Sequence, residues 1–409
     1  MTTTTTHPSG TVQPSGGTER APLALDAARL LSAKKAYTTR FVADAIELNP
    51  YGYDVQPKAA PQAGDVVLAR VTELGKHTKL ESPASRRQTM FLGDEILVAY
   101  GNRYAPDQFL AVVPDDLQPC HLVAGGGLAG TVLEQHAAID KPTAIEPIGL
   151  LSRHGKVVNL QDAAPHQIHS SSQLPGRPPV IAVLGTSMNS GKSTTLGCLV
   201  KGLTTAGLNV SAGKATGTGA GNDPRLFTDG GATKVLDFTD FGYPTTFKLD
   251  YETVRGLLTS MIDALTFSAT DVVVIEIADG VYQGETSRLL SDPVFHDAVD
   301  HVIFSAADAL GAAGGLQVLR ESGVNVAAVS GLLTASPLAA KEAASVLDTP
   351  VIDTFDLCHP ATALGMLPVR ETGIAGTSPV EGRISGTGTP AIVTMVASTP
   401  AAPAAAATL

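Results

Sequence analysis

A glycine-rich loop is the first part of the sequence whose residue types and spacing could do chemistry. Residues 180–197 read VIAVLGTSMNSGKSTTLG, which contains the ending G-K-S-T of a phosphate-binding loop. The usual pattern is G-x-x-x-x-G-K-[ST], but here the first glycine, Gly185, comes one residue early and Thr186 takes its place. An apolar strand before the loop and a helix after it give the context that this motif requires. We therefore expect a phosphate-binding site here, not an ordinary turn with a solvated lysine.

Each part of the loop has an expected task. Backbone amides and the N-terminus of the following helix would bind anionic phosphate, Lys192 would reach the outer phosphates, and Ser193 would ligate Mg²⁺. The residues expected to bind the nucleotide are Gly185, Thr186, Asn189, Ser190, Gly191, Lys192, Ser193 and Thr194.

Two acids follow a second apolar run. In DVVVIEIADG (271–280), Glu276 ends the run and Asp279 lies three residues further on. A carboxylate at the end of a buried strand beside the loop strand could hold Mg²⁺ directly or through water. We expect Glu276 to be this acid and keep Asp279 as the second choice. The alternative is a strand-end acid that caps the next turn.

A third group of polar residues lies in SAGKATGTGAGNDPRLFTDGG (211–231). Lys214, Asp223 and Arg225 would project where ligands bind in open α/β sheets. Lys214 and Arg225 could neutralise charge on a transferring phosphoryl group, and Asp223 could orient or deprotonate an attacking hydroxyl. A mobile surface loop with incidental charges is the alternative. Two further acids are weaker candidates for the base: Asp237 and Asp240.

Residues 279–290 (DGVYQGETSRLL) offer further contacts to a polar substrate. A plain helix start explains this segment equally well, because an acid and a threonine would then occupy the first turn. In this segment Gln283 and Arg288 are candidate substrate-binding residues. Arg225 and Asp240, from the preceding part of the chain, are the other two candidates.

The elements that must position these residues lie in a block at 180–382, which is predicted to be the nucleotide-binding domain. Apolar strands alternate with helical stretches, so we predict a doubly wound, mostly parallel α/β sheet. The expected strands are 180–184, 209–213, 272–277, 301–305, 325–329 and 351–354. The expected helices are 192–206, 250–266, 313–322 and 337–347.

A smaller block at 21–172 precedes it. A helical stretch at 23–48 is followed by short β-rich segments bounded by Gly, Pro, Asp or Asn, as in a small barrel or sandwich. This α+β, β-rich block is predicted to be an accessory or substrate domain, joined to the next by a linker at 173–179. Residues 1–20 and the Ala/Pro tail at 383–409 are predicted to be disordered or flexible.

Composition narrows the classes of partner. The net charge of −11 over 409 residues argues against a nucleic-acid partner, and no apolar run approaches the roughly 18 residues of a membrane span. The N-terminus has no secretory pattern, and three distant cysteines form no disulfide framework, so a reducing cytoplasm fits best. We expect a small-molecule partner and a homo-oligomer, most simply a dimer.

The loop resembles that of dethiobiotin synthetase and its relatives among the P-loop NTPases, which reads G-T-x-x-x-x-G-K-[ST]. The matching residues are Gly185, Thr186, Gly191, Lys192 and Ser193. The family's lysine closing the second strand matches Lys214, and its strand-end acid matches Glu276. The proline after that lysine is Ala215 here, and the family's E-G-A-G-G reads EIADG. With its extra N-terminal block, the chain looks more like two-domain members with this loop and like cyclic diphosphoglycerate synthetase.

The resemblance implies a P-loop fold over about 180–355 and an enzyme that uses ATP and Mg²⁺. Some stand-alone relatives in actinomycete antibiotic pathways act as small-molecule kinases, so the first expectation is phosphorylation of a hydroxyl on a small polar metabolite, for example a nucleoside- or sugar-like one. Lys192, Lys214, Asp223 and Glu276 would be catalytic. A ligase or cyclase acting through an acyl or carbamoyl phosphate is the alternative. A regulatory GTPase lacks support because no N-K-x-D is present, and a protein that uses nucleotide only structurally stays open.

Overall fold

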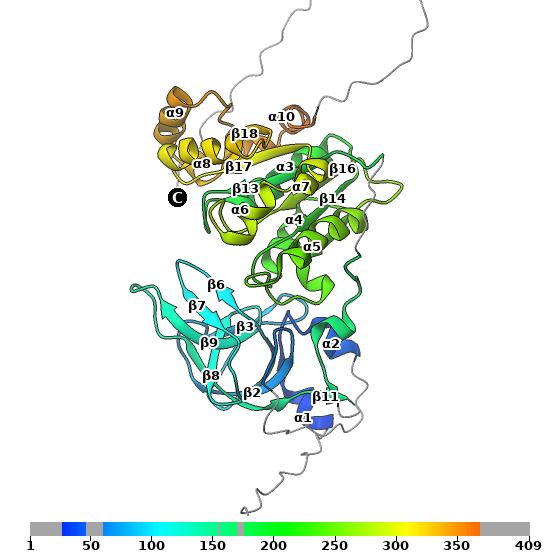
Figure 1. Ribbon diagram of the computed structural model, residues 1–409, viewed down its shortest axis with the longest axis vertical. Helices are drawn as coiled ribbons and strands as arrows, with labels where there is room; N and C mark the ends of the chain where they lie inside the picture. The colour runs from blue at the N-terminus through cyan, green and yellow to red at the C-terminus, as the bar shows by residue number, and fades with distance from the viewer. Residues whose placement is uncertain (1–26, 46–59, 154–155, 170–175, 369–409) are drawn as a thin grey trace, which may run out of the picture. The chain divides into compact units, whose positions relative to one another are not determined.

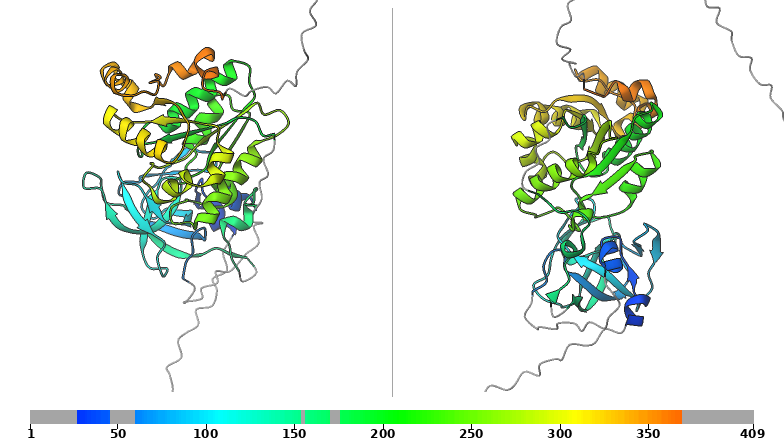
Figure 2. Two further views of the ribbon diagram at one scale, coloured as in Figure 1. Left: turned by 45° about the horizontal axis from the view of Figure 1, so that its top comes forward. Right: turned by 90° about the vertical axis from the view of Figure 1, so that its right-hand side faces the viewer.

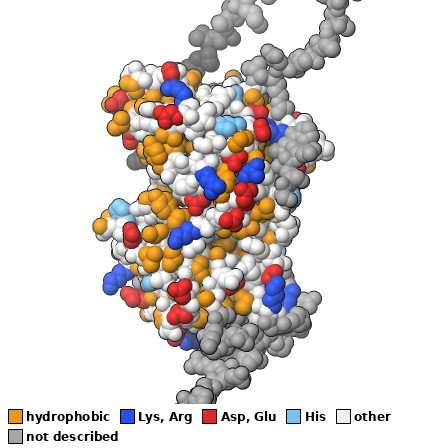
Figure 3. Space-filling model, viewed as in Figure 1, with side chains coloured by type: hydrophobic (Ala, Val, Ile, Leu, Met, Phe, Trp, Pro, Cys, Tyr) orange, Lys and Arg blue, Asp and Glu red, His pale blue; other side chains and the backbone are white. Residues whose placement is uncertain are grey.

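The computed structural model describes residues 27–45, 60–153, 156–169 and 176–368 (Figure 1). The predicted disordered start (1–20) and Ala/Pro tail (383–409) lie outside the described residues. None of the helices among the described residues is both long enough and apolar enough to span a bilayer. On the face shown in Figure 3, acidic and basic side chains are interspersed rather than gathered by sign.

The C-terminal part, here called the P-loop block (176–368), is built on a six-stranded parallel sheet, which confirms the predicted fold class. Its strand order is β15-β14-β16-β13-β17-β18, so the loop strand β13 lies between β16 and β17. The strands are β13 (Val180–Gly185), β14 (Val210–Lys214), β15 (Lys234–Asp237), β16 (Val272–Glu276), β17 (His301–Ser305) and β18 (Val326–Ser330). Because all strands are parallel, their carboxyl ends meet at one edge.

Helices cover both faces of this sheet (Figure 2). Side chains of β13 alternate between two apolar cores: Ile181 and Val183 pack with α3 and α10, whereas Ala182 and Leu184 pack with α5 to α9. The helices are α3 (Lys192–Thr205), α4 (Asn222–Asp229), α5 (Tyr251–Leu265), α6 (Gly284–Leu290), α7 (Pro293–Ala298), α8 (Ala309–Glu321), α9 (Pro337–Val346) and α10 (Pro360–Leu364). The 3-10 turns of this block are η2 (Phe238–Phe241), η3 (Leu332–Ala335) and η4 (Asp356–Cys358). Burial on both faces explains why the strands are continuous apolar runs.

The N-terminal part, here called the barrel block (27–169), is built mainly from antiparallel strands. Strands pair in the order β5-β2-β10-β8-β9, and β9 pairs back with β5, which closes a five-stranded barrel. The strands are β1 (Lys34–Lys35), β2 (Val66–Glu73), β3 (Lys79–Glu81), β4 (Arg87–Thr89), β5 (Glu95–Tyr100), β6 (Arg103–Tyr104), β7 (Phe109–Val112), β8 (Cys120–Ala124), β9 (Leu128–Gln135), β10 (Thr143–Leu150), β11 (Ser152–Arg153) and β12 (Lys156–Val157). Two helices, α1 (Ala27–Ser32) and α2 (Arg40–Ala45), and one 3-10 turn, η1 (Leu160–Ala163), complete the block.

Two predicted elements differ from the structure. The helix expected over 23–48 is interrupted, because Lys34 and Lys35 form β1 and pair in parallel with β5. The strand expected at 351–354 is only a bridge between Val351 and Val329, next to Pro350, which has no amide hydrogen for a ladder. In addition, part of the segment treated as a glycine-rich loop (211–231) folds as helix α4 and places Asp223 in its first turn.

A buried polar cluster joins the two blocks. The Tyr37 hydroxyl donates to Asp237 Oδ2 at 2.8 Å, and both side chains are almost fully buried. Arg40 lies 4.1 Å above the Tyr37 ring and pairs with Asp240 at 2.8 Å. Burial first, and then the charge of Asp237, raise the pKa of Tyr37, so its hydroxyl keeps its proton and acts as a donor. The barrel block is thereby fixed to the end of β15.

Tyr37→Phe tests this link. The substitution leaves Asp237 Oδ2 buried without its donor, which should lower the free energy of unfolding by about 1–3 kcal/mol. Urea unfolding followed by circular dichroism measures the change. The matched control is Tyr282→Phe, because Tyr282 is 77% exposed. Equal stability of the two variants would contradict the proposed importance of this hydrogen bond.

Candidate functional site

The loop between β13 and α3 has the backbone that a phosphate cradle needs. Gly191 caps α3 with φ 99°, and a Cβ there would lie 2.9 Å from the Leu332 amide nitrogen. That amide donates to the Ser190 carbonyl at 2.9 Å and fixes the loop from the side of η3. The first amides of α3 have no partner within the helix and are available to an anion.

The early glycine of the motif has a steric reason. A Cβ on Gly185 would lie 2.3 Å from Ser190 Oγ and 2.8 Å from Lys192 Cγ, so these two side chains pass directly over it. Thr186, which follows, donates its amide to the Ser305 carbonyl of β17 at 3.0 Å. The shifted glycine therefore lets the lysine fold back across the loop.

Lys192 is buried, with 6% of its surface exposed. Its ammonium donates to the carbonyls of Ser187 at 2.8 Å and Asp279 at 2.6 Å. Burial lowers its pKa, and the charge of Glu276 opposes that effect. The ammonium is therefore held beside the loop by two neutral backbone carbonyls. An anionic phosphate would bind the ammonium more strongly than these carbonyls and could replace them.

Three charges meet at the carboxyl ends of β14 and β16. The parallel register places Lys214 opposite Glu276, and Lys214 Nζ lies 3.2 Å from Glu276 Oε1. The same ammonium binds Asp223 from the first turn of α4. Burial alone would lower the pKa of Lys214, but the two carboxylates outweigh it and raise that pKa. Burial also works against the charged form of Asp223, yet Lys214 lowers the pKa of this carboxyl.

Glu276 has an unused oxygen. The side chain is 1% exposed, and none of the described residues forms a hydrogen bond with its Oε2. A buried carboxylate oxygen without a donor is costly and suits a divalent cation. Among the described residues, no group of three or more His, Cys, Asp or Glu side chains could hold a metal by itself. Mg²⁺ is usually held by one or two carboxylates together with substrate phosphates. Glu276 and Ser193 therefore suit a Mg²⁺ site that is completed only when the phosphates of a nucleotide are bound.

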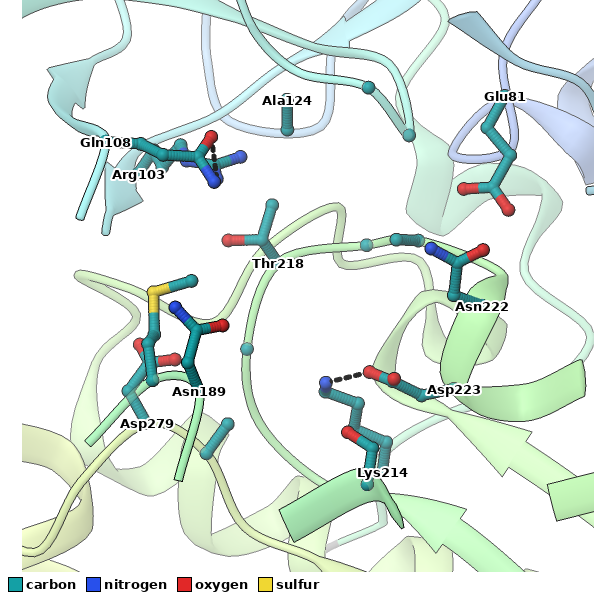
Figure 4. A pocket seen from close by; sticks show the side chains of 18 of the residues that line it. Glu81, Arg103, Gln108, Ala124, Asn189, Lys214, Thr218, Asn222, Asp223 and Asp279 are labelled. Carbon is teal, nitrogen blue, oxygen red and sulfur yellow. Dashed lines mark hydrogen bonds and ion pairs between the residues drawn. The ribbon is translucent and has the colours of Figure 1, made fainter. Parts of the chain in front are cut away.

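These residues line a cavity of about 780 Å³ that the barrel block closes from the other side (Figure 4). The P-loop block contributes Lys192, Ser193, Lys214, Asp223, Glu276 and Asp279. Asn189 of the loop also lines the cavity and donates to Asp107 Oδ2 of the barrel block at 2.9 Å. The structure therefore brings together all four residues predicted to be catalytic. Thr194 and Gly191 line the cavity as well, whereas Gly185, Thr186 and Ser190 shape the loop beneath it.

Burial raises the pKa of Asp279, and the neighbouring lysines Lys192 and Lys214 oppose this. Figure 4 shows Asp279 beside Asn189, across the cavity from the Lys214–Asp223 pair. The two cavity aspartates are thus perturbed in opposite directions, Asp223 toward the ionised form and Asp279 toward the neutral form.

The predicted substrate residues do not line the cavity. Arg225 donates to Ser85 Oγ at 3.2 Å, Asp240 pairs with Arg40, and Gln283 accepts from the Thr286 amide to cap α6. Arg288 stacks 3.8 Å from the Tyr251 ring centroid. Each of the four has a structural contact elsewhere in the fold.

The barrel block supplies cavity residues that no sequence pattern singles out, among them Glu81, Arg103 and Gln108. Glu81 Oε2 accepts from the Gly221 amide at 3.0 Å, just before α4. The one available signal was the glycine run at 125–127. A Cβ on Gly126 would lie 1.9 Å from the Gly219 carbonyl oxygen, so this turn marks a close approach of the two blocks.

No protein-family model matches the chain, and no curated protein matches it. Among solved structures, it is similar to the signal recognition particle receptor FtsY of Elizabethkingia anophelis in complex with GDP, at 21% identity and a TM-score of 0.30 over 47% of this chain and 61% of that chain. A nucleotide-binding protein of Archaeoglobus fulgidus in complex with ADP matches at 14% identity and 0.30, over 46% and 86%. The kinase domain of the Escherichia coli tyrosine kinase ETK matches at 15% and 0.27, over 36% and 65%.

The match to FtsY spans about three fifths of that chain. Because all of these TM-scores are below 0.5, the description of the fold rests on this chain's own strand order and on the geometry of the loop between β13 and α3.

Lys214→Met tests the buried charge cluster. Removing the ammonium leaves Glu276 buried with no ion partner, which should cost about 3–5 kcal/mol of unfolding free energy. The double variant Lys214→Met/Glu276→Gln should recover part of that loss, because no uncompensated charge then remains at this strand end. Urea unfolding measures both, with the exposed Lys201→Met on α3 as the control. A single variant as stable as the control would show that Lys214 does not compensate Glu276.

Proposed function

We propose that the protein is an ATP- and Mg²⁺-dependent phosphotransferase that phosphorylates a hydroxyl of a small polar metabolite. The observation that carries the proposal is the cavity of about 780 Å³, in which the phosphate-binding loop faces a wall of polar side chains from the barrel block. A cavity lined by charged and polar side chains beside the loop suits a small polar acceptor, because an acceptor bound there lies next to the phosphoryl group and displaces water from it. The more specific resemblance to the dethiobiotin synthetase group remains an expectation from the loop sequence.

Two lysines suit stabilisation of the transferring group. Lys192 would exchange its carbonyl contacts for the outer phosphates, and Lys214 would face the same charge from the end of β14. When bound, Mg²⁺ would supply charge neutralisation between the outer phosphates, held by Ser193 and Glu276. Both lysines are largely buried, so their effect on developing charge is stronger than it would be in water.

The proposed step is an in-line displacement. The acceptor oxygen forms a bond to the γ-phosphorus, the bond from that phosphorus to the β–γ bridging oxygen breaks, and ADP leaves with the electron pair. The hydroxyl proton passes to a carboxylate. We assign this role to Asp279 rather than to Asp223, because Lys214 binds Asp223 and lowers its pKa, whereas burial raises the pKa of Asp279.

Lys192→Ala tests the phosphotransfer proposal. The variant should fold normally and lose at least about 100-fold in turnover, because the lysine would bind charge that develops in the transition state. The measurement is ³¹P NMR of ATP incubated with a panel of polyols, sugars and nucleosides. The matched control is Lys201→Ala, whose exposed side chain lies on the same helix.

The products separate the alternatives. A new phosphate-ester signal with ADP supports the kinase. ADP and inorganic phosphate with an unphosphorylated condensed product indicate a ligase, and hydrolysis of GTP without any acceptor indicates a switch protein. Unchanged turnover in Lys192→Ala would contradict a catalytic role for the loop.

Asp279→Asn tests the assignment of the base. A carboxylate base must be ionised, so kcat/KM should fall as the pH decreases through its pKa, which burial raises above the ordinary value of about 3.9. The variant should lose this acid limb and about 100-fold or more in kcat.

The control for this assignment is Glu81→Gln, because burial also raises the pKa of Glu81 and this carboxylate lines the same cavity. The control should retain the acid limb. A limb that persists in Asp279→Asn but disappears in Asp223→Asn would return the role to Asp223.

A further inference from the structure

The barrel wall of the cavity contains a buried arginine that forms no ion pair with the described residues. Arg103, on β6, is 6% exposed and lines the cavity. Its Nη2 donates to Gln108 Oε1 at 3.1 Å, while its Nε has no hydrogen-bond partner in the described part of the chain. Within 27–45, 60–153, 156–169 and 176–368, no carboxylate forms an ion pair with this guanidinium.

The guanidinium nonetheless keeps its charge. Burial lowers the pKa of Arg103 to about 10, and the charges of Asp107 and Asp279 partly oppose this. At neutral pH the side chain is therefore protonated. A buried cation whose charge is only partly compensated and that lacks a direct ion pair is costly, so it suits a further anionic partner.

Two acids act on this charge without forming an ion pair with it, Asp107 and Asp279. Asp107 Oδ2 accepts from Asn189, and its Oδ1 is buried with no hydrogen-bond partner among the described residues. Asp279 contacts Lys192 through its backbone carbonyl and not through its carboxylate. Neither replaces the ion pair that a buried arginine usually has.

The charged side chains of the barrel wall are mostly positive, like Arg103. Its charged lining residues are Lys76, Lys79, Arg87 and Arg103 against one acid, Glu81, which is four cations to one carboxylate. His77 in this wall stays neutral at pH 7, because burial lowers its pKa to about 4. This local excess of positive charge contrasts with the net charge of −11 for the whole chain.

We propose that Arg103, aligned by Gln108, binds an anionic group of the acceptor, a carboxylate or a phosphate monoester, at the barrel wall of the cavity. The guanidinium presents paired donors that match two oxygens of such a group. Figure 4 shows Arg103 and Gln108 on the side of the cavity opposite Lys214 and Asp223, so an acceptor anchored there extends toward the phosphate loop. The acceptor is then a hydroxylated metabolite that also carries a negative charge. That the bound group belongs to an acceptor rests on the proposed phosphotransfer.

The experiment measures thermal unfolding of the full chain saturated with Mg²⁺ and a non-hydrolysable ATP analogue, which occupies the phosphate loop. Inorganic phosphate and malonate are the two probes, added in separate titrations. Wild-type protein should be stabilised by at least one of them, by mass action on the folded state. Stabilisation by phosphate alone indicates that the site binds a phosphate monoester, and stabilisation by malonate alone indicates that it binds a carboxylate. Stabilisation by both indicates that the site selects for negative charge.

Arg103→Met should lose this stabilisation, with the apparent anion affinity falling at least about 10-fold. Without anions the variant should unfold at the same temperature as wild type or higher, because it removes an unpaired buried charge. Arg103→Lys should bind the anions more weakly than wild type but better than Arg103→Met. The control is Arg320→Met, whose exposed side chain pairs with Asp348 and should respond as wild type.

Three results would overturn the proposal. One is a wild-type protein that neither anion stabilises, and another is an Arg103→Met variant that the anions stabilise as much as wild type. The third is loss of affinity for the ATP analogue in Arg103→Met with the anion response unchanged, which would place the guanidinium on the nucleotide instead. This experiment follows binding and not transfer, so its failure leaves the phosphotransfer proposal to be judged by Lys192→Ala.

Discussion

The site depends on placing four charges in a largely buried position at one edge of the parallel sheet. Lys214 lies between Glu276 and Asp223, and Lys192 lies beside them over the loop. Each charge alone would be expensive to bury, so the arrangement persists because the ammonium of Lys214 compensates two carboxylates. The register of β14 against β16 places Lys214 opposite Glu276, and the start of α4 brings Asp223 to the same ammonium. Among the described residues, Glu276 Oε2 has no hydrogen-bond partner, and Glu276 lines the cavity beside the phosphate loop.

The barrel block gives that edge a second wall. Tyr37 and Arg40 anchor it to Asp237 and Asp240, and Glu81 binds the backbone at the start of α4. Asp237 lies opposite Lys214 in the register of β15 against β14, and Gly221 immediately precedes α4, so the barrel block contacts the backbone elements that carry the charge cluster. A nucleotide site of this kind needs only the sheet and its loop. The acceptor specificity that we propose comes from the added block.

The sequence predicts local features of this fold well. The apolar runs at Val180–Gly185 and His301–Ser305, the helix after Lys192, and the position of Lys214 and Glu276 at strand ends all follow from patterns within a few residues. The interruption of the expected helix at Lys34 does not follow from such a pattern, because pairing with β5 overrides the local helical pattern. The glycine-rich sequence around Asp223 is typical of a loop, although Asp223 lies in the first turn of helix α4. The cavity arginine Arg103 had no signal at all, since its importance arises only when β6 faces a loop some 85 residues away in the chain.

The phosphate loop and the barrel wall line one shared cavity, and paramagnetic relaxation measures how close they are. In this experiment Mn²⁺ replaces Mg²⁺ with a non-hydrolysable ATP analogue, and the ¹⁵Nε–H signals of the arginine side chains are recorded, with Arg103 assigned from its absence in Arg103→Lys. If the cavity is shared, Mn²⁺ broadens the Arg103 signal strongly and leaves that of Arg320 on α8 unchanged. An Arg103 signal as sharp as that of Arg320, with the Mn²⁺–nucleotide complex bound, would contradict it.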